Sequence, residues 1–169
     1  MSDDGLIGFD LECEECGYNL RSLPVGHRCP ECGGPAPPGV ASPRDLLIYR
    51  QLKANAATAD RIGCSVNAML FVRDAIAHVQ STRSTMDLLR QISAAEICVG
   101  VRVYARKYFN DDDEARELLS EWGIRRSEDV GAIVFGLVRE RLLVPSARDR
   151  PEDFRGLFKI ETLFSDRTH

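Results

Sequence analysis

"DDDEARELLSEWGIRRSEDVGAIVFGLV", residues 111–138, contains two amphipathic patterns joined by a short turn. The carboxylates over 111–114 stand where a helix N-terminus favours negative charge, and Gly123 permits the left-handed conformation that ends a helix. Between them, apolar residues recur at the i, i+3, i+4, i+7 spacing of one helical face: Ala115, Leu118, Leu119 and Trp122. The stretch therefore predicts two consecutive helices and a mainly α fold.

The second pattern begins at Ser127, a residue type that caps helix N-termini. Because the connection between the two helices is short, we expect them to be neighbours, with Trp122 at the centre of their contact. Gly131, Phe135 and Leu142 lie off the main apolar stripe, so they form either a second contact face or additional core. The main stripe comprises Val130, Ile133, Val134, Leu137 and Val138.

Two more helices are expected nearer the N-terminus, over about residues 43–60 and 65–80. Ser42 followed by Pro43 is a start signal for the first, because proline is tolerated at the first helical position. One face of this helix carries Ile48, Leu52, Ala56 and Ala59. The inward face of the second carries Val66, Met69, Leu70, Ala75, Ile76 and Val79.

A third upstream helix and a C-terminal hairpin complete the predicted fold. Ser93 and Glu96 have the spacing of a capping box, although the β-branched run over 97–103 leaves a strand as the alternative. LLV, residues 142–144, and LFKIE, residues 157–161, flank a polar loop and can pair as a hairpin. We therefore expect a helical domain of about five helices that ends in a short β-hairpin, in the order of a winged helix.

Four of the six cysteines lie in CEECGYNLRSLPVGHRCPECGG, residues 13–34. A Cys-x-x-Cys pair lets one turn of backbone direct both sulfurs at one ion, and a glycine follows each pair. Four thiolates favour one zinc ion per chain, with iron as the less favoured alternative. Because protein ligands fill all four positions, the predicted site is structural. The predicted metal ligands are Cys13, Cys16, Cys29 and Cys32.

Alternatives to this four-cysteine site are weaker. Disulfides require an oxidising compartment, which nothing in the sequence indicates. His27 stands two residues before Cys29, so a set of three cysteines and one histidine is conceivable, but a solvated loop histidine is the favoured interpretation. We expect Tyr18, Leu20 and Leu23 to form a miniature core, which is too small to fold without its metal.

Charge and composition divide the chain. Residues 1–34 contain seven carboxylates and two arginines, a formal charge of −5, which leaves +1 for the remainder of a chain whose total is −4. GGPAPPGVASP, residues 33–43, has no charged residue and no regular pattern. We therefore predict a zinc ribbon over 1–34, a flexible linker over 35–43 and a helical domain over 44–169.

The overall composition is that of a globular protein, with 44% hydrophobic and 28% charged residues. The sequence has no apolar run of about 18 residues, and its first residues are acidic, unlike a signal peptide. We therefore expect a cytoplasmic location, without membrane association.

Two family resemblances follow from the motifs. The CGY and CP-x-C details of residues 13–34 resemble a zinc ribbon and also the rubredoxin-like ribbon of rubrerythrins, which holds iron. No Glu-x-x-His pair of a di-iron bundle is present, however. LFVRDAI (70–76), EWGIRRSEDVGAIVFGLV (121–138) and RPEDF (150–154) resemble a family of hypothetical proteins restricted to Planctomycetes and Verrucomicrobia. That resemblance supports the helices and implies no particular activity.

The sequence carries no motif of the enzyme classes that we considered. A zinc deaminase requires proline before the second cysteine pair, whereas Pro30 follows Cys29 here, and no His-x-Glu is present. Phosphate-binding glycine loops and the Gly-x-Ser-x-Gly elbow are also absent. The acidic run at 111–113 fits helix capping better than a cation site, and Cys64 and Cys98 fit buried packing. We therefore expect a non-enzymatic protein.

These observations favour a protein-interaction or adaptor module. In a winged helix the second helix would enter DNA, but its start carries Glu128 and Asp129, which phosphates repel. Only Arg125 and Arg126 in the turn favour that role. A protein partner is therefore predicted, with a nucleic-acid-binding regulator as the first alternative and a rubredoxin-type iron electron carrier as the second. The sequence does not predict an oligomeric state.

Overall fold

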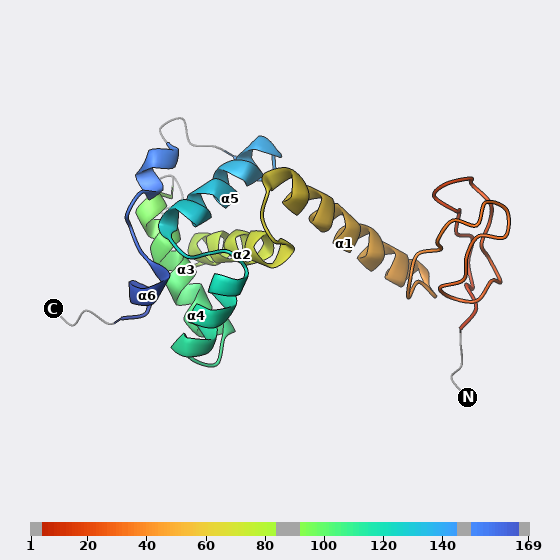
Figure 1. The fold of residues 1–169 in the computed structure, drawn as a ribbon, viewed down its shortest axis with the longest axis horizontal. Coiled ribbons are helices and arrows are strands. Elements are labelled where there is room, and N and C mark those ends of the chain that lie inside the picture. Colours follow the sequence, from red (N-terminus) through yellow and green to blue (C-terminus); the bar gives the residue numbers. More distant parts are fainter. Residues whose placement is uncertain (1–4, 84–91, 145–149, 166–169) are drawn as a thin grey trace. The chain divides into compact units, whose positions relative to one another are not determined.

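The computed structural model describes residues 5–83, 92–144 and 150–165. In these residues the fold is mainly helical, as predicted, with isolated bridges but no regular strand (Figure 1). None of the described helices is by itself long and apolar enough to cross a membrane; α1 and α2 meet that criterion only when joined across the break between them. The elements are α1 (Pro43–Ile62), α2 (Val66–Thr82), α3 (Ala94–Tyr108), α4 (Asp112–Glu121), α5 (Ser127–Arg139), the 3-10 helix η2 (Pro151–Phe154) and α6 (Ile160–Leu163).

The chain forms two compact units, Met1–Ala56 and Ala57–His169, which we call the N-terminal and helical units. The boundary lies within α1, whereas the sequence suggests a linker over 35–43. In that segment Ala36 and Val40 are buried in the core of the N-terminal unit, and Leu46 and Tyr49 of α1 pack against the same core. The Gly/Pro-rich segment thus contributes apolar side chains, because irregular backbone can still bury small residues.

Polar side chains cap the starts of α2, α3 and α4. Ser65 accepts the Ala68 N–H at the start of α2, at 3.1 Å. Ser93 and Glu96 form the predicted capping box, so the β-branched run over 97–103 is helical. Asp111 caps α4 by accepting two backbone N–H groups, at 2.9 and 2.8 Å. The first residue of the acidic run therefore caps the helix, while Asp112 and Asp113 form ion pairs with Arg106 and Arg116.

In the turn between α4 and α5, the left-handed conformation predicted for Gly123 is confirmed, whereas the cap predicted for α5 is wrong. Gly123 has a φ of 93°, and the next residue, Ile124, is buried and donates its N–H to the Leu119 carbonyl at 2.8 Å. The sequence suggests Ser127 as the cap of α5, but Arg126 occupies the N-cap position. Ser127 is instead the first helical residue, and its buried hydroxyl accepts hydrogen bonds from the segment that precedes α6.

The predicted hairpin between residues 142–144 and 157–161 does not form. Lys159 instead makes an isolated antiparallel bridge with Arg126, and the Ile160 N–H donates to the Arg125 carbonyl at 2.8 Å. Because the extended backbone before α5 already supplies these partners, the second run pairs there and then enters α6. Within the described residues the fold has no wing.

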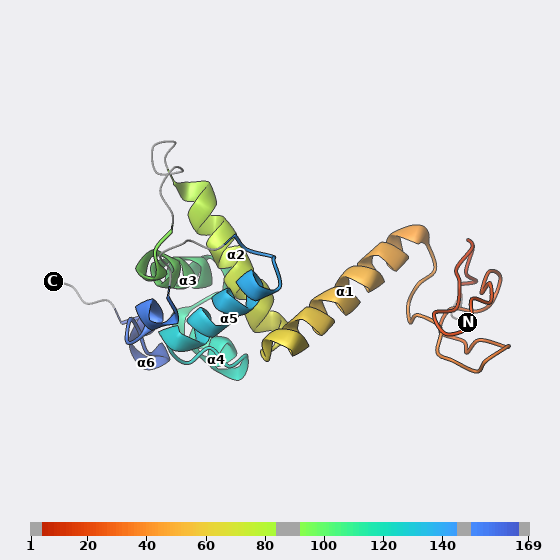
Figure 2. The ribbon, with the colours of Figure 1, turned by 90° about the horizontal axis from the view of Figure 1, so that it is seen from above.

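The core of the helical unit is built around α2, which packs against α3 and α5 (Figures 1 and 2). Gly100 permits the close approach of α3 to α2, because a Cβ there would clash with Val79. Gly136 likewise permits the close approach of α5 to the last residue of α1, because a Cβ there would lie 2.5 Å from Cγ2 of Ile62. Both glycines lie inside helices, where alanine would be favoured if space allowed.

Two aromatic residues singled out in the sequence lie in this core in different ways. Trp122 is half-buried, and its ring centroid lies 5.9 Å from that of Phe71 in α2 and 5.7 Å from that of Phe109 at the end of α3. Its ring contacts therefore join the end of α4 to α2 and α3. The expected contact with α5 stays a prediction. Phe135 of α5 contacts Phe154 of η2 edge-on at 6.3 Å, so this part of the candidate second face is core.

Candidate metal centre

The two Cys-x-x-Cys stretches fold into equivalent turns. The Gly17 N–H donates to the Cys13 carbonyl and the Gly33 N–H to the Cys29 carbonyl, each at 2.9 Å. Both glycines have positive φ angles, 76° and 73°, which other residues rarely adopt. Each of the two Cys-x-x-Cys stretches thus forms the same backbone turn.

The turns bring the four predicted sulfur ligands together. The Cys13 and Cys32 sulfurs lie 3.6 Å apart, as do those of Cys16 and Cys29, and all four sulfurs lie within 4.8 Å of one another. A disulfide would require about 2.05 Å. Zinc–sulfur bonds of about 2.3 Å in a tetrahedron place the sulfurs about 3.8 Å apart. The cluster therefore has the ligand type and spacing to hold one metal ion.

The thiols do not share one protonation behaviour. Backbone N–H groups of Glu15 and Cys16 favour the Cys13 thiolate and lower its pKa to about 7. The Gly34 N–H likewise favours the Cys32 thiolate, at 3.4 Å, but the neighbouring thiols, that of Cys16 most of all, and partial desolvation of the sulfur outweigh it and raise the Cys32 pKa to about 12. Four adjacent thiolates repel one another, and a divalent cation among them removes that penalty.

A small apolar core supports the cluster. Cys13 and Cys29 are buried within it, whereas Cys16 and Cys32 are exposed. Of the predicted miniature core, Leu20 is fully buried, Leu23 packs against the cluster and Tyr18 is 39% exposed. Several other members of this core stand in stretches without a periodic pattern: Ile7, Leu11, Ala36 and Val40.

The segment predicted as a zinc ribbon has isolated β-bridges and no regular ladder among its described residues. Glu12 and Asn19 form one isolated bridge and Arg28 and Pro35 another, one at each cysteine turn. His27, the conceivable alternative ligand, is exposed and does not belong to the sulfur cluster. The site is therefore held mainly by turns and the small core.

Polar contacts add support that the spacing of cysteines does not reveal. Lys53 of α1 forms an ion pair with Glu14, which lies between the two cysteines of the first turn. The ammonium group of Lys53 also lies 5.8 Å from the centroid of the Tyr49 ring. Only the structure connects these residues, because Lys53 is remote from the turn in sequence.

The remaining cysteines lie outside the cluster, in the helical unit. Cys98 is buried, and burial raises its pKa to about 12. Cys64 is half-buried, and burial raises its pKa as well. Both thiols are therefore protonated near neutral pH, as suits the packing role that the sequence suggests.

Comparison of the chain with models of protein families, with curated proteins and with solved structures gives no match. The resemblances to zinc ribbons and to the Planctomycetes and Verrucomicrobia-restricted family therefore stay predictions. The four-cysteine cluster is the feature that any account of function must explain.

Proposed function

We propose that the chain is a non-enzymatic, cytoplasmic zinc-binding protein in which a structural four-cysteine site holds the N-terminal unit folded and the helical unit binds a protein partner. The observation that carries the metal assignment is the convergence of four thiols within 4.8 Å. Four protein ligands complete a tetrahedron, so no coordination position is left for a substrate. The site therefore supports structure.

Zinc content is the direct test of the metal. We expect one zinc ion per chain and a colourless protein when the full chain is purified from iron-supplemented cells and measured by elemental analysis. The matched control is Cys64→Ser, which removes a thiol outside the cluster and is expected to keep its zinc. Stoichiometric iron and a red colour would contradict the zinc site and favour the electron-carrier alternative.

A protein partner is supported by charge. The N-terminal unit holds most of the chain's excess of carboxylates, which disfavours contact between that unit and nucleic acid. At the start of α5, Asp129 accepts the N–H groups of Arg125 and Arg126, at 2.8 and 2.9 Å. A carboxylate thus stands where a DNA-reading helix would meet phosphate.

Chemical cross-linking of the full chain in its native cells, followed by mass spectrometry, tests this second part. We expect specific protein cross-links that persist after nuclease treatment. Recovery of nucleic acid cross-links alone would contradict the protein partner and favour the nucleic-acid-binding alternative.

A further inference from the structure

A groove of about 610 Å³ lies on the helical unit between α3 and the segment over 156–165. One wall is a single face of α3, since its lining residues follow the i, i+3, i+4, i+7 spacing: Ala95, Cys98, Val99 and Arg102. The opposite wall includes Leu157, Lys159 and Leu163. The volume falls within the range of about 300–1,000 Å³ that is usual for ligand sites.

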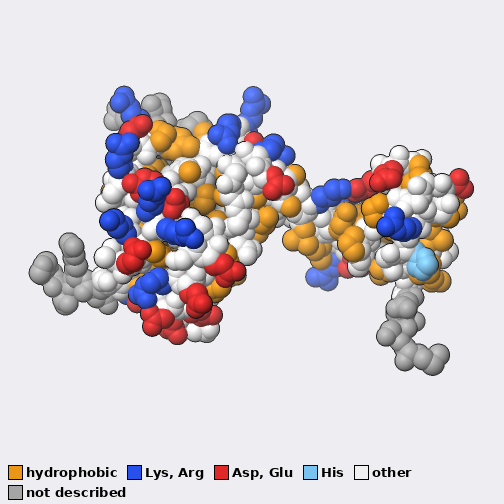
Figure 3. Space-filling view, viewed as in Figure 1, with side chains coloured by type: hydrophobic (Ala, Val, Ile, Leu, Met, Phe, Trp, Pro, Cys, Tyr) orange, Lys and Arg blue, Asp and Glu red, His pale blue; other side chains and the backbone are white. Residues whose placement is uncertain are grey.

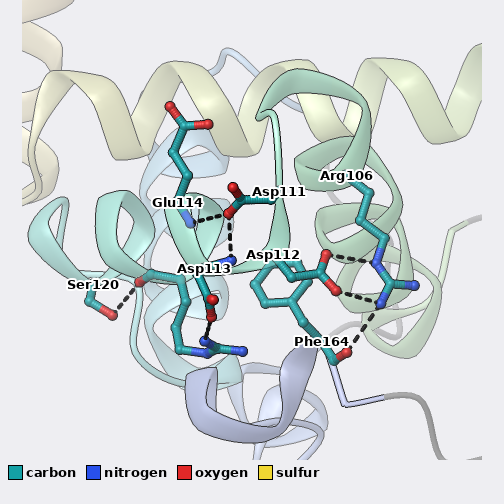
Figure 4. A network of polar contacts seen from close by, with 8 residues as sticks. Arg106, Asp111, Asp112, Asp113, Glu114, Ser120 and Phe164 are labelled. Carbon is teal, nitrogen blue, oxygen red and sulfur yellow. Dashed lines mark hydrogen bonds and ion pairs between the residues drawn. The ribbon is translucent and has the colours of Figure 1, made fainter.

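The second wall is held in place at both ends. Near its start, the buried Ser127 hydroxyl accepts the N–H groups of Leu157 and Phe158, at 3.0 and 3.3 Å. At its end, Arg106 of α3 donates to the Phe164 carbonyl at 3.1 Å and also binds Asp112 (Figure 4). Because both ends are fixed to neighbouring helices, the groove exists before any ligand arrives.

Apolar side chains are exposed on both walls. Val99 is 53% exposed and Leu157 is 42% exposed, while Cys98 and Leu163 are buried in the same walls. Exposed aliphatic groups on facing walls of a groove are a favourable contact for an apolar side chain of a ligand.

Each wall also carries one cation. Neither Arg102 on α3 nor Lys159 on the opposite wall makes a side-chain hydrogen bond or ion pair with another described residue. Arg106 and, more weakly, Arg102 lower the pKa of Asp112, but Arg106 binds both carboxylate oxygens, at 2.9 and 2.8 Å. Asp and Glu side chains of this unit gather over α4 (Figure 3). One carboxylate, that of Glu128, lies at the start of the second wall, where it accepts the Gly156 N–H at 3.2 Å. Beyond it, the parts of the two walls that carry Arg102 and Lys159 present positive charge beside apolar surface.

We propose that this groove binds an acidic peptide segment of a partner protein, with one apolar side chain between Val99 and Leu157 and carboxylates near Arg102 and Lys159. This inference rests on the proposed protein partner and deepens it by naming the surface and the chemistry of the segment. Carboxylates complement both cations, and an aliphatic side chain covers the exposed valine and leucine. A nucleic acid backbone would supply the charge but no aliphatic group.

The test uses a phage-displayed library of random 12-residue peptides, selected on the full chain with zinc in the buffer. We expect the selected peptides to combine Asp or Glu with Leu, Ile, Val or Phe. A synthetic peptide of the selected sequence is expected to bind at least about tenfold more weakly in 500 mM than in 50 mM NaCl, because salt screens exposed charges.

Paired variants locate the binding. The double variant Arg102→Glu and Lys159→Glu is expected to weaken binding of the peptide at least about tenfold, because its glutamates would repel the carboxylates of the peptide. The control is the double variant Arg44→Glu and Arg50→Glu, which replaces two exposed arginines of α1. It makes the same change in net charge and is expected to keep full affinity for the peptide. Val99→Ser should weaken binding, whereas Val103→Ser, one turn along α3 and outside the groove lining, should not.

Three results would overturn the groove assignment. They are selection of peptides without acidic residues, no selectable peptide at all, and a peptide whose affinity is the same for both charge-reversed proteins. The last would leave the protein-partner proposal standing, since cross-linking tests that separately. A 20-nucleotide DNA or RNA probe that binds and is lost with Arg102→Glu and Lys159→Glu, while no acidic peptide is selected, would reassign the groove to a polyanion.

Discussion

Single residues decide how closely the helices of this protein approach. Gly131 of α5 lies against Phe154 of η2, where a Cβ would be 2.8 Å from Cγ of the ring and 2.9 Å from its Cβ. The sequence shows a glycine inside an amphipathic helix, which costs about 1 kcal/mol relative to alanine. It does not show the residue that faces the glycine, because Phe154 comes from an element remote in sequence.

Gly131→Ala is therefore expected to lower the free energy of unfolding by about 1–2 kcal/mol, since overpacking a filled core outweighs the gain in helix propensity. Urea denaturation followed by circular dichroism measures the change. Ala132→Gly, at the exposed neighbouring position, isolates the propensity cost in the same helix. A more stable Gly131→Ala protein would mean that the Phe154 ring is free to move aside.

Trp122 is the single tryptophan of the chain, and its position makes it a probe of the helical unit. Half-buried against Phe71 and Phe109, it is expected to emit at a blue-shifted wavelength and to resist soluble quenchers. Trp122→Ala should cost about 2–4 kcal/mol of unfolding free energy, toward the lower end of the cost of deleting a large core residue.

The outcome distinguishes core packing from a partner contact. If Trp122→Ala changes the unfolding free energy by less than about 1 kcal/mol and the emission resembles that of indole in water, Trp122 serves a surface role instead. Phe9→Ala is a control that should leave the tryptophan emission unchanged, because Phe9 packs against the core of the N-terminal unit.

At the scale of secondary-structure elements, local sequence signals predicted the helices. The pairing of the segment over 157–161 depends instead on a partner that is remote in sequence. The sequence predicts the capping box of Ser93 and Glu96 and a cap in the acidic run that begins at Asp111, and the structure contains both. Such caps can be predicted because they involve residues only a few positions apart. The structure of the segment over 157–161 was harder to predict, because its apolar pattern suits a strand but does not identify the backbone with which that strand would pair. Its partner is the backbone between α4 and α5.

Ser127→Ala tests the link between α5 and this segment. The Ser127 hydroxyl is buried and accepts two backbone N–H groups, so its loss leaves both without that partner and should cost about 1–3 kcal/mol. Urea unfolding measures the loss, and hydrogen exchange should quicken at the amides of Leu157 and Phe158. Ser120→Ala removes a hydroxyl bonded only to a carbonyl of its own helix and should change stability by less than about 0.5 kcal/mol. Equal effects of the two changes would contradict the assigned role.

At the scale of the whole molecule, the two units are stabilised by different means. The helical unit has an extensive apolar core, whereas the N-terminal unit has a small one that includes two of the four predicted metal ligands, Cys13 and Cys29. Cysteine spacing was enough to predict the four sulfur positions, because the Cys-x-x-Cys turn is local. It did not predict Ile7, Leu11 or Val40 in the surrounding core, because irregular loops carry no periodic signal.

Metal removal should therefore act on one unit. A unit below about 40–60 residues with a small core depends on its metal, so chelation or Cys29→Ser is expected to unfold the described residues before α1. The helical unit keeps its own core and should retain its melting transition nearly unchanged. Two-dimensional amide spectra recorded during chelation follow both units separately, and Cys64→Ser provides the control that loses a thiol but no ligand. Loss of the signals of Leu20 and Val40 together with those of Val101 and Leu137 would mean that the units fold as one, and the division within α1 would then have no thermodynamic meaning.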